Sequence, residues 1–278
     1  MRTIKIVADS AANITHLDRA DFALAPLKIR TTEKEFVDDA ALDVADMLKH
    51  FDSYSGRSFT SCPNPGDWLD AFDDAEDVFC VTITGGLSGS YNAACTAKEM
   101  YESENPGRRV FVLDSLSAGP EIALMVLKLE ELVSSGMPAE EIDTAIRAYA
   151  ANTGLLFMLE SLKNFAANGR VPVTVARLAG VLGIRVVGRA SEKGQLDPLH
   201  KCRGEANALS TLLKELKSAG LYKGKVQISH CCNEKAANTL RDMIESSVPL
   251  AKVTISACRG LCSYYAEKGG LLIGFEKQ

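Results

Sequence analysis

The segment Val78-Phe-Cys-Val-Thr-Ile-Thr-Gly-Gly-Leu-Ser-Gly-Ser-Tyr-Asn-Ala-Ala94 joins three elements that together predict a ligand site. Residues 78–83 are mostly apolar and predict a buried strand, and a helix is expected to begin near Ser90 or Tyr91. The glycines between them allow a sharp turn and let a ligand approach the backbone closely. Unpaired amides and the helix dipole at the start of a helix favour an anionic group. The loop therefore predicts a site for a small anion.

Composition sets the class of the chain before any motif is considered. The 278 residues are 46% hydrophobic and 24% charged, values typical of a globular protein with a sizeable core. A net charge of −5 gives no electrostatic reason to expect nucleic acid or an anionic membrane as partner. No apolar run is long enough to insert stably in a membrane, and the N-terminus enters a strand without a signal peptide. We expect a cytoplasmic protein.

The cysteines are expected to be reduced and structural. None of the eight forms a Cys-x-x-Cys pair, and Cys258 and Cys262, four residues apart, have no neighbouring histidine or second pair to complete a zinc set. Asp9 and Asp114 each follow a predicted strand and precede a serine, which is typical of a capping residue. We therefore expect neither a metal nor a cofactor.

Alternation of strands and helices predicts an α/β fold for the first half. Strands are expected at 4–8, 78–83 and 109–113, with helices at 42–51, 66–75, 120–135 and 139–153. Strands separated by helices form a parallel, Rossmann-like sheet with helices on its flanks. We assign this N-terminal domain to residues 1–154. Ligands of such sheets gather at the carboxyl ends of the strands, where the glycine loop also lies.

The second half, residues 155–278, predicts an α/β domain with a mixed or antiparallel sheet. Apolar helices are expected at 155–167 and 175–182, followed by two strands, 184–187 and 196–201, around a turn. Helices at 205–219 and 234–246 then alternate with strands at 225–230, 252–257 and 271–275. The absence of a long linker predicts that the two domains share an interface.

Ser88 is the first candidate for chemistry within the glycine loop. A hydrolase elbow requires Gly-x-Ser-x-Gly, but the sequence Gly86-Leu-Ser-Gly-Ser90 ends in serine. The phosphate-binding Gly-Lys-Ser/Thr pattern and the dinucleotide pattern Gly-x-Gly-x-x-Gly are also absent. Only His230 among the histidines ends a predicted strand, and it is more typical of a cap than of a base. Hydrolysis is therefore disfavoured.

Two further groups are candidate partners of Ser88. Thr60 and Ser61 precede Pro63 in a segment that is also typical of an ordinary turn. Together with Ser88 they would form a two-sided hydroxyl cradle. Arg170 follows Asn-Gly at a predicted helix end, where it either complements the helix dipole or faces the interdomain cleft and balances a carboxylate.

The motifs, taken in order, resemble those of the DegV family of fatty-acid-binding proteins over nearly the whole chain. The matching pieces are the strand ending in Asp9-Ser10, Thr60-Ser-Cys-Pro63, Gly86-Leu-Ser-Gly-Ser-Tyr91, Val112-Leu-Asp-Ser115 and Asn168-Gly-Arg-Val171. The resemblance implies a two-domain, non-enzymatic lipid-binding protein that holds one long-chain fatty acid, such as palmitate, stearate or oleate, in a tunnel between the domains. It also implies that a separate fatty acid kinase phosphorylates the acid.

The resemblance assigns the head-group roles. It implies that Thr60 and Ser88 bond to the carboxylate and that Arg170 lies near it. Many members have a histidine near the head group where this chain has Cys258 or Arg259, and we expect Arg259 to replace it. The full set of expected binding residues is Thr60, Ser61, Gly86, Ser88, Gly89, Arg170, Cys258 and Arg259.

The physical chemistry of the residues agrees with this hypothesis. Burial of ~14 methylenes at ~0.8 kcal/mol each gives roughly 11 kcal/mol before ordering costs. An unpaired buried carboxylate would cancel much of that gain, and hydroxyls, amides and an arginine are the groups that prevent it. Two alternatives stay open: an acyl- or phosphoryl-transfer enzyme that uses the loop as an oxyanion or phosphate cradle, and a ligand-gated interaction module.

Overall fold

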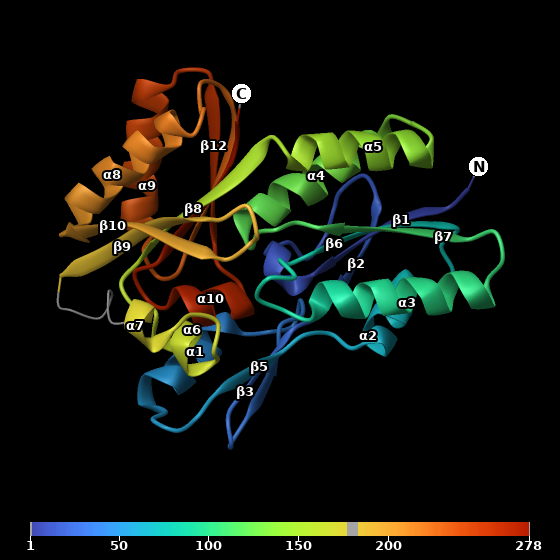
Figure 1. The fold of residues 1–278 in the computed structure, drawn as a ribbon, viewed down its shortest axis with the longest axis horizontal. Coiled ribbons are helices and arrows are strands. Elements are labelled where there is room, and N and C mark those ends of the chain that lie inside the picture. Colours follow the sequence, from blue (N-terminus) through green and yellow to red (C-terminus); the bar gives the residue numbers. More distant parts are fainter. Residues whose placement is uncertain (1, 177–182, 278) are drawn as a thin grey trace.

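The computed structural model describes residues 2–176 and 183–277. Its first layer is a four-stranded parallel sheet in the order β2-β1-β6-β7. The strands are β1 (Ile4–Asp9), β2 (Asp21–Ala25), β6 (Asp77–Thr82) and β7 (Arg109–Asp114). All six residues of β6 are buried, because helices cover both faces of the sheet (Figure 1).

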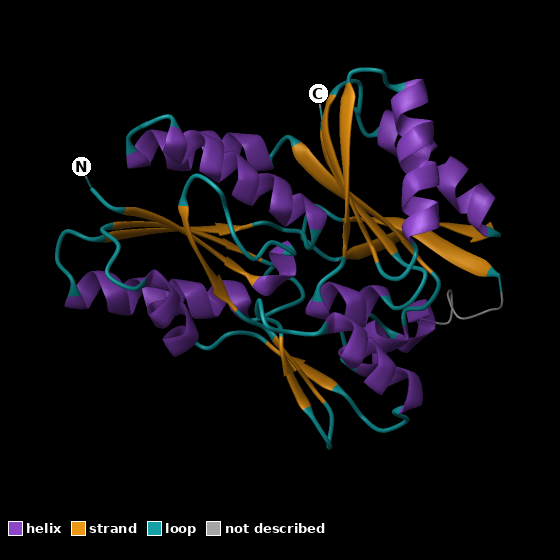
Figure 2. Ribbon diagram, turned by 180° about the vertical axis from the view of Figure 1, so that it is seen from behind, coloured by secondary structure: helices purple, strands orange, loops and turns teal. Residues whose placement is uncertain are grey.

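Successive side chains of β6 supply the two sides of this sheet. Val78 and Cys80 pack with α2 (Pro65–Phe72) and α3 (Ser90–Glu104), around the buried Trp68. Phe79 and Val81 pack on the opposite side with α4 (Pro120–Ser134) and α5 (Ala139–Ala150). Figure 2 shows the two helix pairs on either side of the strands. This arrangement confirms the parallel, Rossmann-like sheet expected for the first half.

A six-stranded mixed sheet forms the second layer, in the order β10-β9-β8-β13-β11-β12. Only β11 and β12 pair in parallel; the other neighbours are antiparallel. Two helices, α8 and α9, pack on one face of it (Figure 1). The bounds are β8 (Thr153–Leu159), β9 (Ile184–Ala190), β10 (Leu196–Arg203), α8 (Glu205–Ser218), β11 (Gly224–His230), α9 (Glu234–Ser247), β12 (Ala251–Ala257) and β13 (Leu271–Glu276).

The helix expected at 155–167 is wrong for most of its length. Residues Thr153–Leu159 form β8, and all seven of them are buried. A strand buried on both faces has a continuous apolar sequence, which resembles that of a buried helix. Only α6 (Lys163–Ala167) is helical in this range. Of the helix expected at 175–182, the first residues end α7 (Val173–Ala176), and the remainder lies outside the described residues.

Helix α4 joins the two layers. It packs under β1 and β6 of the first sheet and also contacts β8, β11 and β13 of the second. Gly274 of β13 permits this approach, since a Cβ there would lie 2.5 Å from the backbone of Pro120. The Thr153 hydroxyl of β8 donates to Glu121 of α4 at 2.8 Å. Because β8 begins at Thr153, the domain boundary expected at 154 falls inside this strand.

A third, smaller unit lies beside both sheets, and of its elements only the helix expected at 42–51 was predicted from the sequence. Strands β3 (Lys28–Arg30), β4 (Glu35–Val37) and β5 (Phe59–Ser61) form an antiparallel sheet in the order β4-β3-β5, accompanied by η1 (Ser10–Ala12) and α1 (Val44–Ser53). Helix α10 (Gly260–Ala266) returns from the C-terminal half to pack there. Its Leu261 and Tyr264 share a core with Ile29 and Met47.

Candidate functional site

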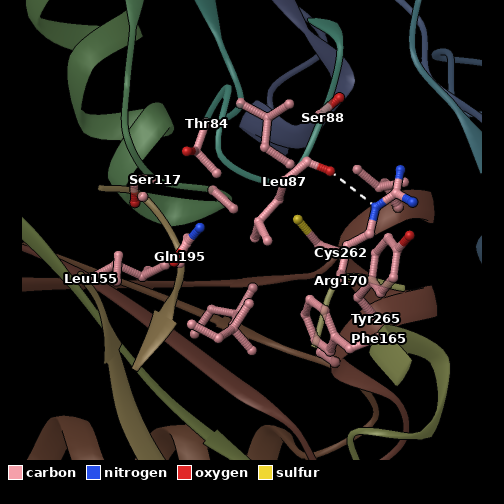
Figure 3. A pocket seen from close by; sticks show the side chains of 18 of the residues that line it. Thr84, Leu87, Ser88, Ser117, Leu155, Phe165, Arg170, Gln195, Cys262 and Tyr265 are labelled. Atoms are coloured by element: carbon pink, nitrogen blue, oxygen red, sulfur yellow. Dashed lines mark hydrogen bonds between the residues drawn. The ribbon is translucent and has the colours of Figure 1, made fainter. Parts of the chain in front are cut away.

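A cavity of about 240 Å³ lies between the two halves of the chain. Its walls are mainly apolar and come from both halves, with Ile83 and Leu87 on one side and Phe157, Phe165 and Leu272 on the other. Figure 3 shows Arg170 and Tyr265 at one end, and Leu155, Ser117 and Gln195 at the other. The cavity thus has a cationic, hydroxyl-rich end and a largely apolar body.

The glycine loop between β6 and α3 is fixed from below by Asp9. One carboxylate oxygen of Asp9 accepts from the Ile83 amide at 2.8 Å and from the Ser90 hydroxyl at 2.6 Å. Ser88 lines the cavity, and its hydroxyl oxygen accepts from the Ser90 amide at 3.2 Å. The Ser88 hydroxyl proton remains available to a ligand. The expected combination of strand, loop and helix is confirmed.

Asp9 is fully buried, and its other oxygen, Oδ1, has no hydrogen-bond partner. Burial raises the pKa of Asp9 to about 7, although the bonds from Ser90 and Ile83 oppose the shift. The negative charge of Asp38 raises this pKa further. A carboxyl group beneath the loop therefore changes its charge near neutral pH.

The Thr60 segment meets the glycine loop from the opposite side. A Cβ on Gly89 would lie 3.2 Å from the sulfur of Cys62, so the two loops touch. Thr60 and Ser61 end β5 and line the cavity. Asn64 caps α2 by accepting from the Gly66 amide at 2.7 Å, which fixes the end of the segment. The structure therefore brings the two hydroxyl loops together as the sequence predicts.

Arg170 is bound both to the glycine loop and to the end of α6, whose C-cap is Asn168. Its Nε donates to the Leu87 carbonyl at 3.0 Å, drawn in Figure 3, and its Nη1 donates to the Asn168 carbonyl at 2.6 Å. Gly169 has a φ of +69°, which turns the chain so that Arg170 reaches the cavity. The guanidinium thus places positive charge at the end where Ser88 and Thr60 lie.

The tip of the β9–β10 hairpin closes on the glycine loop across the domain interface. A Cβ on Gly86 would lie 2.6 Å from the Lys193 carbonyl oxygen. A Cβ on the buried Gly194, whose φ is +67°, would overlap the Thr84 hydroxyl oxygen. We call this contact the glycine clasp. The contact is this close because residues 86 and 194 are both glycine.

Six of the eight expected binding residues therefore lie at or against the cavity. Thr60, Ser61, Ser88, Gly89 and Arg170 line it, and Gly86 contributes to the glycine clasp instead.

The structure does not bring Cys258 and Arg259 to the cavity wall. The Arg259 amide donates to Asn13 at 3.0 Å, and its guanidinium bonds to the Asp39 carbonyl beside the third sheet. Cys258 is buried directly after the end of β12, where its amide donates to the His230 carbonyl at 2.8 Å. The expectation that Arg259 replaces the family histidine at the head group is not met by this geometry, because its side chain is directed to Asp38 and Asp39.

Sequence reasoning missed Tyr265, Gln195 and Cys262, which also line the cavity. Tyr265 and Cys262 belong to α10, whose start is held by Asp38: its carboxylate accepts from the Gly260 amide at 2.9 Å and the Leu261 amide at 2.8 Å. The signal that could have found Tyr265 is the aromatic pair in the uncharged segment Gly260-Leu-Cys-Ser-Tyr-Tyr265.

No cluster of three or more His, Cys, Asp or Glu side chains suited to a metal occurs in the ranges 2–176 and 183–277. Within the same ranges no helix has the length and apolar character needed to cross a membrane.

Fold and cavity together define a two-domain α/β protein with an apolar interdomain cavity that is polar and cationic at one end. The chain belongs to the DegV family: the family profile, described as an uncharacterised protein of the DegV family, matches residues 3–278. A DegV domain-containing protein of Streptococcus pneumoniae is 41% identical over 278 residues, 99% of each chain. The family resemblance drawn from the motifs is thereby confirmed.

Two solved structures of similar sequence share the fold. A DegV family protein from Eubacterium eligens, loaded with heptadecanoic acid, has a TM-score of 0.96 at 43% identity. The match covers 99% of this chain and 100% of that chain. The Streptococcus pneumoniae Fatty Acid Kinase (Fak) B3 protein, loaded with linoleic acid, has a TM-score of 0.97 at 40% identity, with 99% of this chain and 100% of that chain covered. The α/β fold class expected from the sequence is confirmed.

Proposed function

We propose that this protein binds one long-chain fatty acid in the interdomain cavity, with the carboxylate between Thr60, Ser88 and Arg170. The observation that carries the proposal is the polarity of the cavity: the hydroxyls of Thr60 and Ser88 and the guanidinium of Arg170 gather at one end of walls that are mostly apolar. Two proteins of the same fold and at least 40% identity are described as loaded with fatty acids of this kind.

The energetics favour a ligand with one anionic end and a long apolar tail. The tail gains roughly 0.8 kcal/mol per buried methylene. The carboxylate avoids the cost of an unpaired buried charge, because it receives charge-assisted hydrogen bonds. Arg170 is suited to this role since its two bonds to backbone carbonyls fix the guanidinium without neutralising it.

Binding is favoured over acyl or phosphoryl transfer by the content of the cavity wall. The described residues that line it include no histidine, aspartate, glutamate or lysine that would act as a general base. The same hydroxyls are therefore better suited to hold a carboxylate than to attack one.

A kinase partner is the second part of the proposal. The similar Streptococcus pneumoniae protein carries fatty acid kinase in its name. We propose that a separate kinase phosphorylates the bound acid at the Thr60 and Ser88 end. A cytoplasmic location, in which the free thiols stay reduced, belongs to the same proposal. Incubation of loaded protein with a fatty acid kinase and ATP should yield the acyl-phosphate, detectable as its hydroxamate.

Native mass spectrometry of the purified protein tests the binding proposal. We expect a co-purifying mass in the range of palmitate, stearate or oleate. Thr60→Ala and Ser88→Ala should each weaken binding roughly 10- to 100-fold, since a hydrogen bond to a charged group contributes about 1.5–3 kcal/mol. Ser103→Ala is the matched control, because this exposed hydroxyl bonds only to its own helix. Unchanged retention in the Thr60/Ser88 double variant would overturn the head-group assignment.

A further inference from the structure

Helix α10 presents two adjacent tyrosines to β5, and each forms a hydroxyl pair with it. The Tyr264 hydroxyl lies 2.7 Å from the Ser58 hydroxyl, and the Tyr265 hydroxyl lies 2.7 Å from the Thr60 hydroxyl. The two pairs face different spaces. Tyr265 lines the interdomain cavity, whereas Tyr264 lines a separate cleft of about 870 Å³ whose wall is more polar than that of the cavity.

We propose that the Tyr265 hydroxyl is a direct ligand of the fatty-acid carboxylate and forms, with Thr60, a paired donor that defines the head-group end. The inference rests on the proposed function and adds to it a residue and a mode of recognition. It also supplies the contact that Arg259, directed toward Asp39, does not make.

The Thr60 and Tyr265 hydroxyls have one hydrogen-bond donor left over. Thr60 and Tyr265 have two hydroxyl protons between them, and their mutual bond uses one. Neither hydroxyl has another protein partner in the described part of the chain. One proton of the pair therefore remains to be donated, and both residues line the cavity. A carboxylate is the acceptor that a half-buried, unused O–H donor favours most.

The Tyr264 hydroxyl, in contrast, already has two hydrogen-bond partners within the protein. Its hydroxyl accepts from the Asn168 side-chain amide at 2.9 Å and also bonds to Ser58. This tyrosine thus has protein partners on both sides and needs no ligand. The two residues are neighbours on one helix, but Tyr264 is buried and Tyr265 is partly buried, and each lines a different space.

Packing holds the Tyr265 ring in the orientation that the proposal requires. Its centroid lies 4.6 Å from that of Phe165 and 5.0 Å from that of Tyr264. The start of α10 is fixed by Asp38 through two amide bonds. A donor held this firmly loses little freedom on binding, which increases the affinity that one hydrogen bond contributes.

A tyrosine at this position also has a consequence for pH. Burial raises the pKa of Tyr265, although the nearby charge of Arg170 and the bond to Thr60 oppose the shift. The phenol therefore stays protonated and neutral across the physiological range. A histidine in the same place would lose its proton, and with it part of its attraction for a carboxylate, as pH rises through about 6.5.

The test compares Tyr265→Phe with Tyr264→Phe in delipidated full-length protein titrated with palmitate by calorimetry. We expect Tyr265→Phe to raise Kd roughly 10- to 100-fold and Tyr264→Phe to leave it within about twofold of wild type. Circular dichroism and thermal unfolding of both variants check that α10 stays folded. Equal Kd values for wild type and Tyr265→Phe would overturn the inference, and so would an equal loss in Tyr264→Phe.

A second arm separates direct contact from packing. Tyr265→His should lose more palmitate affinity between pH 6 and pH 8 than wild type does, because Asp9 beneath the glycine loop titrates in both proteins and only the variant also loses the imidazolium. Identical pH profiles for the two proteins would place the residue 265 side chain outside the head-group contact. If the wild type binds no palmitate, the proposed function itself fails. Wild-type binding with an unchanged Tyr265→Phe overturns the tyrosine role alone.

Discussion

Asp9→Asn should remove a pH dependence of stability that the wild-type protein carries beneath its glycine loop. Asp9 is fully buried, and its pKa is raised to about 7. The ordinary aspartate pKa in an unfolded chain is about 3.9. Between these values the folded protein keeps a proton that the unfolded chain releases. The free energy of unfolding therefore falls as pH rises through this window and levels off above pH 7.

The magnitude follows from the distance between the two pKa values. Each unit corresponds to about 1.4 kcal/mol, so the full window of about three units is worth about 4 kcal/mol. Between pH 5 and pH 8 the contribution of Asp9 should fall by about 3 kcal/mol. Asparagine has no charge to lose, and its carbonyl oxygen can still accept from Ile83 and Ser90. The variant should therefore gain stability relative to wild type as pH rises.

Urea unfolding of both proteins at pH 5, 6, 7 and 8 measures this difference directly. Asp38 and Glu121 are also buried with raised pKa values, but they are present in both proteins, so their contributions largely cancel. Asp38 is the charged group that acts on Asp9, and Asp38→Asn in the same assay reports how strongly the two are coupled. Parallel pH profiles for wild type and Asp9→Asn would refute the reasoning.

Three further substitutions test the glycine clasp, the role of Arg259 and the end of the cavity opposite Arg170. Gly194→Ala should open the glycine clasp and speed fatty-acid release at least several-fold in a stopped-flow displacement assay. Gly136→Ala is the control, because Gly136 has a similar positive φ but no atom near its Cβ position, so this variant shows the effect of backbone strain alone. Arg259→Gln should lower the free energy of unfolding by about 1–2 kcal/mol, because the hydrogen bond to the Asp39 carbonyl is lost. The same variant should leave the Kd for palmitate unchanged. A large rise in Kd would instead show that Arg259 contacts the head group. Leu155→Trp fills the end opposite Arg170 and should shift the co-purifying acids toward shorter chains by mass spectrometry, whereas an unchanged acid profile would place the tail elsewhere.

The parts of the fold that could be predicted from the sequence are those encoded locally. Residues 78–94 carry the strand, loop and helix in one uninterrupted pattern, and the structure reproduces all three. Turn residues and hydroxyls mark the loops that carry Thr60, Ser88 and Arg170, and all three residues line the cavity. The strand Thr153–Leu159 was mistaken for a helix, because burial on both faces removes the alternation that identifies strands.

What the sequence could not reveal depends on contacts between distant segments. Tyr265 meets Thr60 across a separation of 205 residues, and no local pattern encodes that pairing. The expectation for Arg259 assumed that a residue near the family histidine position would point the same way. In the fold, Asp38 binds the amides at the start of α10, and the guanidinium of Arg259 is drawn toward the third sheet instead.

The return of α10 to the N-terminal half has a consequence for how the chain can be divided. Leu261 and Tyr264 complete the core around Ile29 and Met47, and β8 begins where the first half ends. A gene split near residue 154 would encode two fragments, the first without its α10 contacts and the second with that helix uncovered. The two domains therefore depend on each other to fold. Fragments divided at that point should fold only when they are produced together.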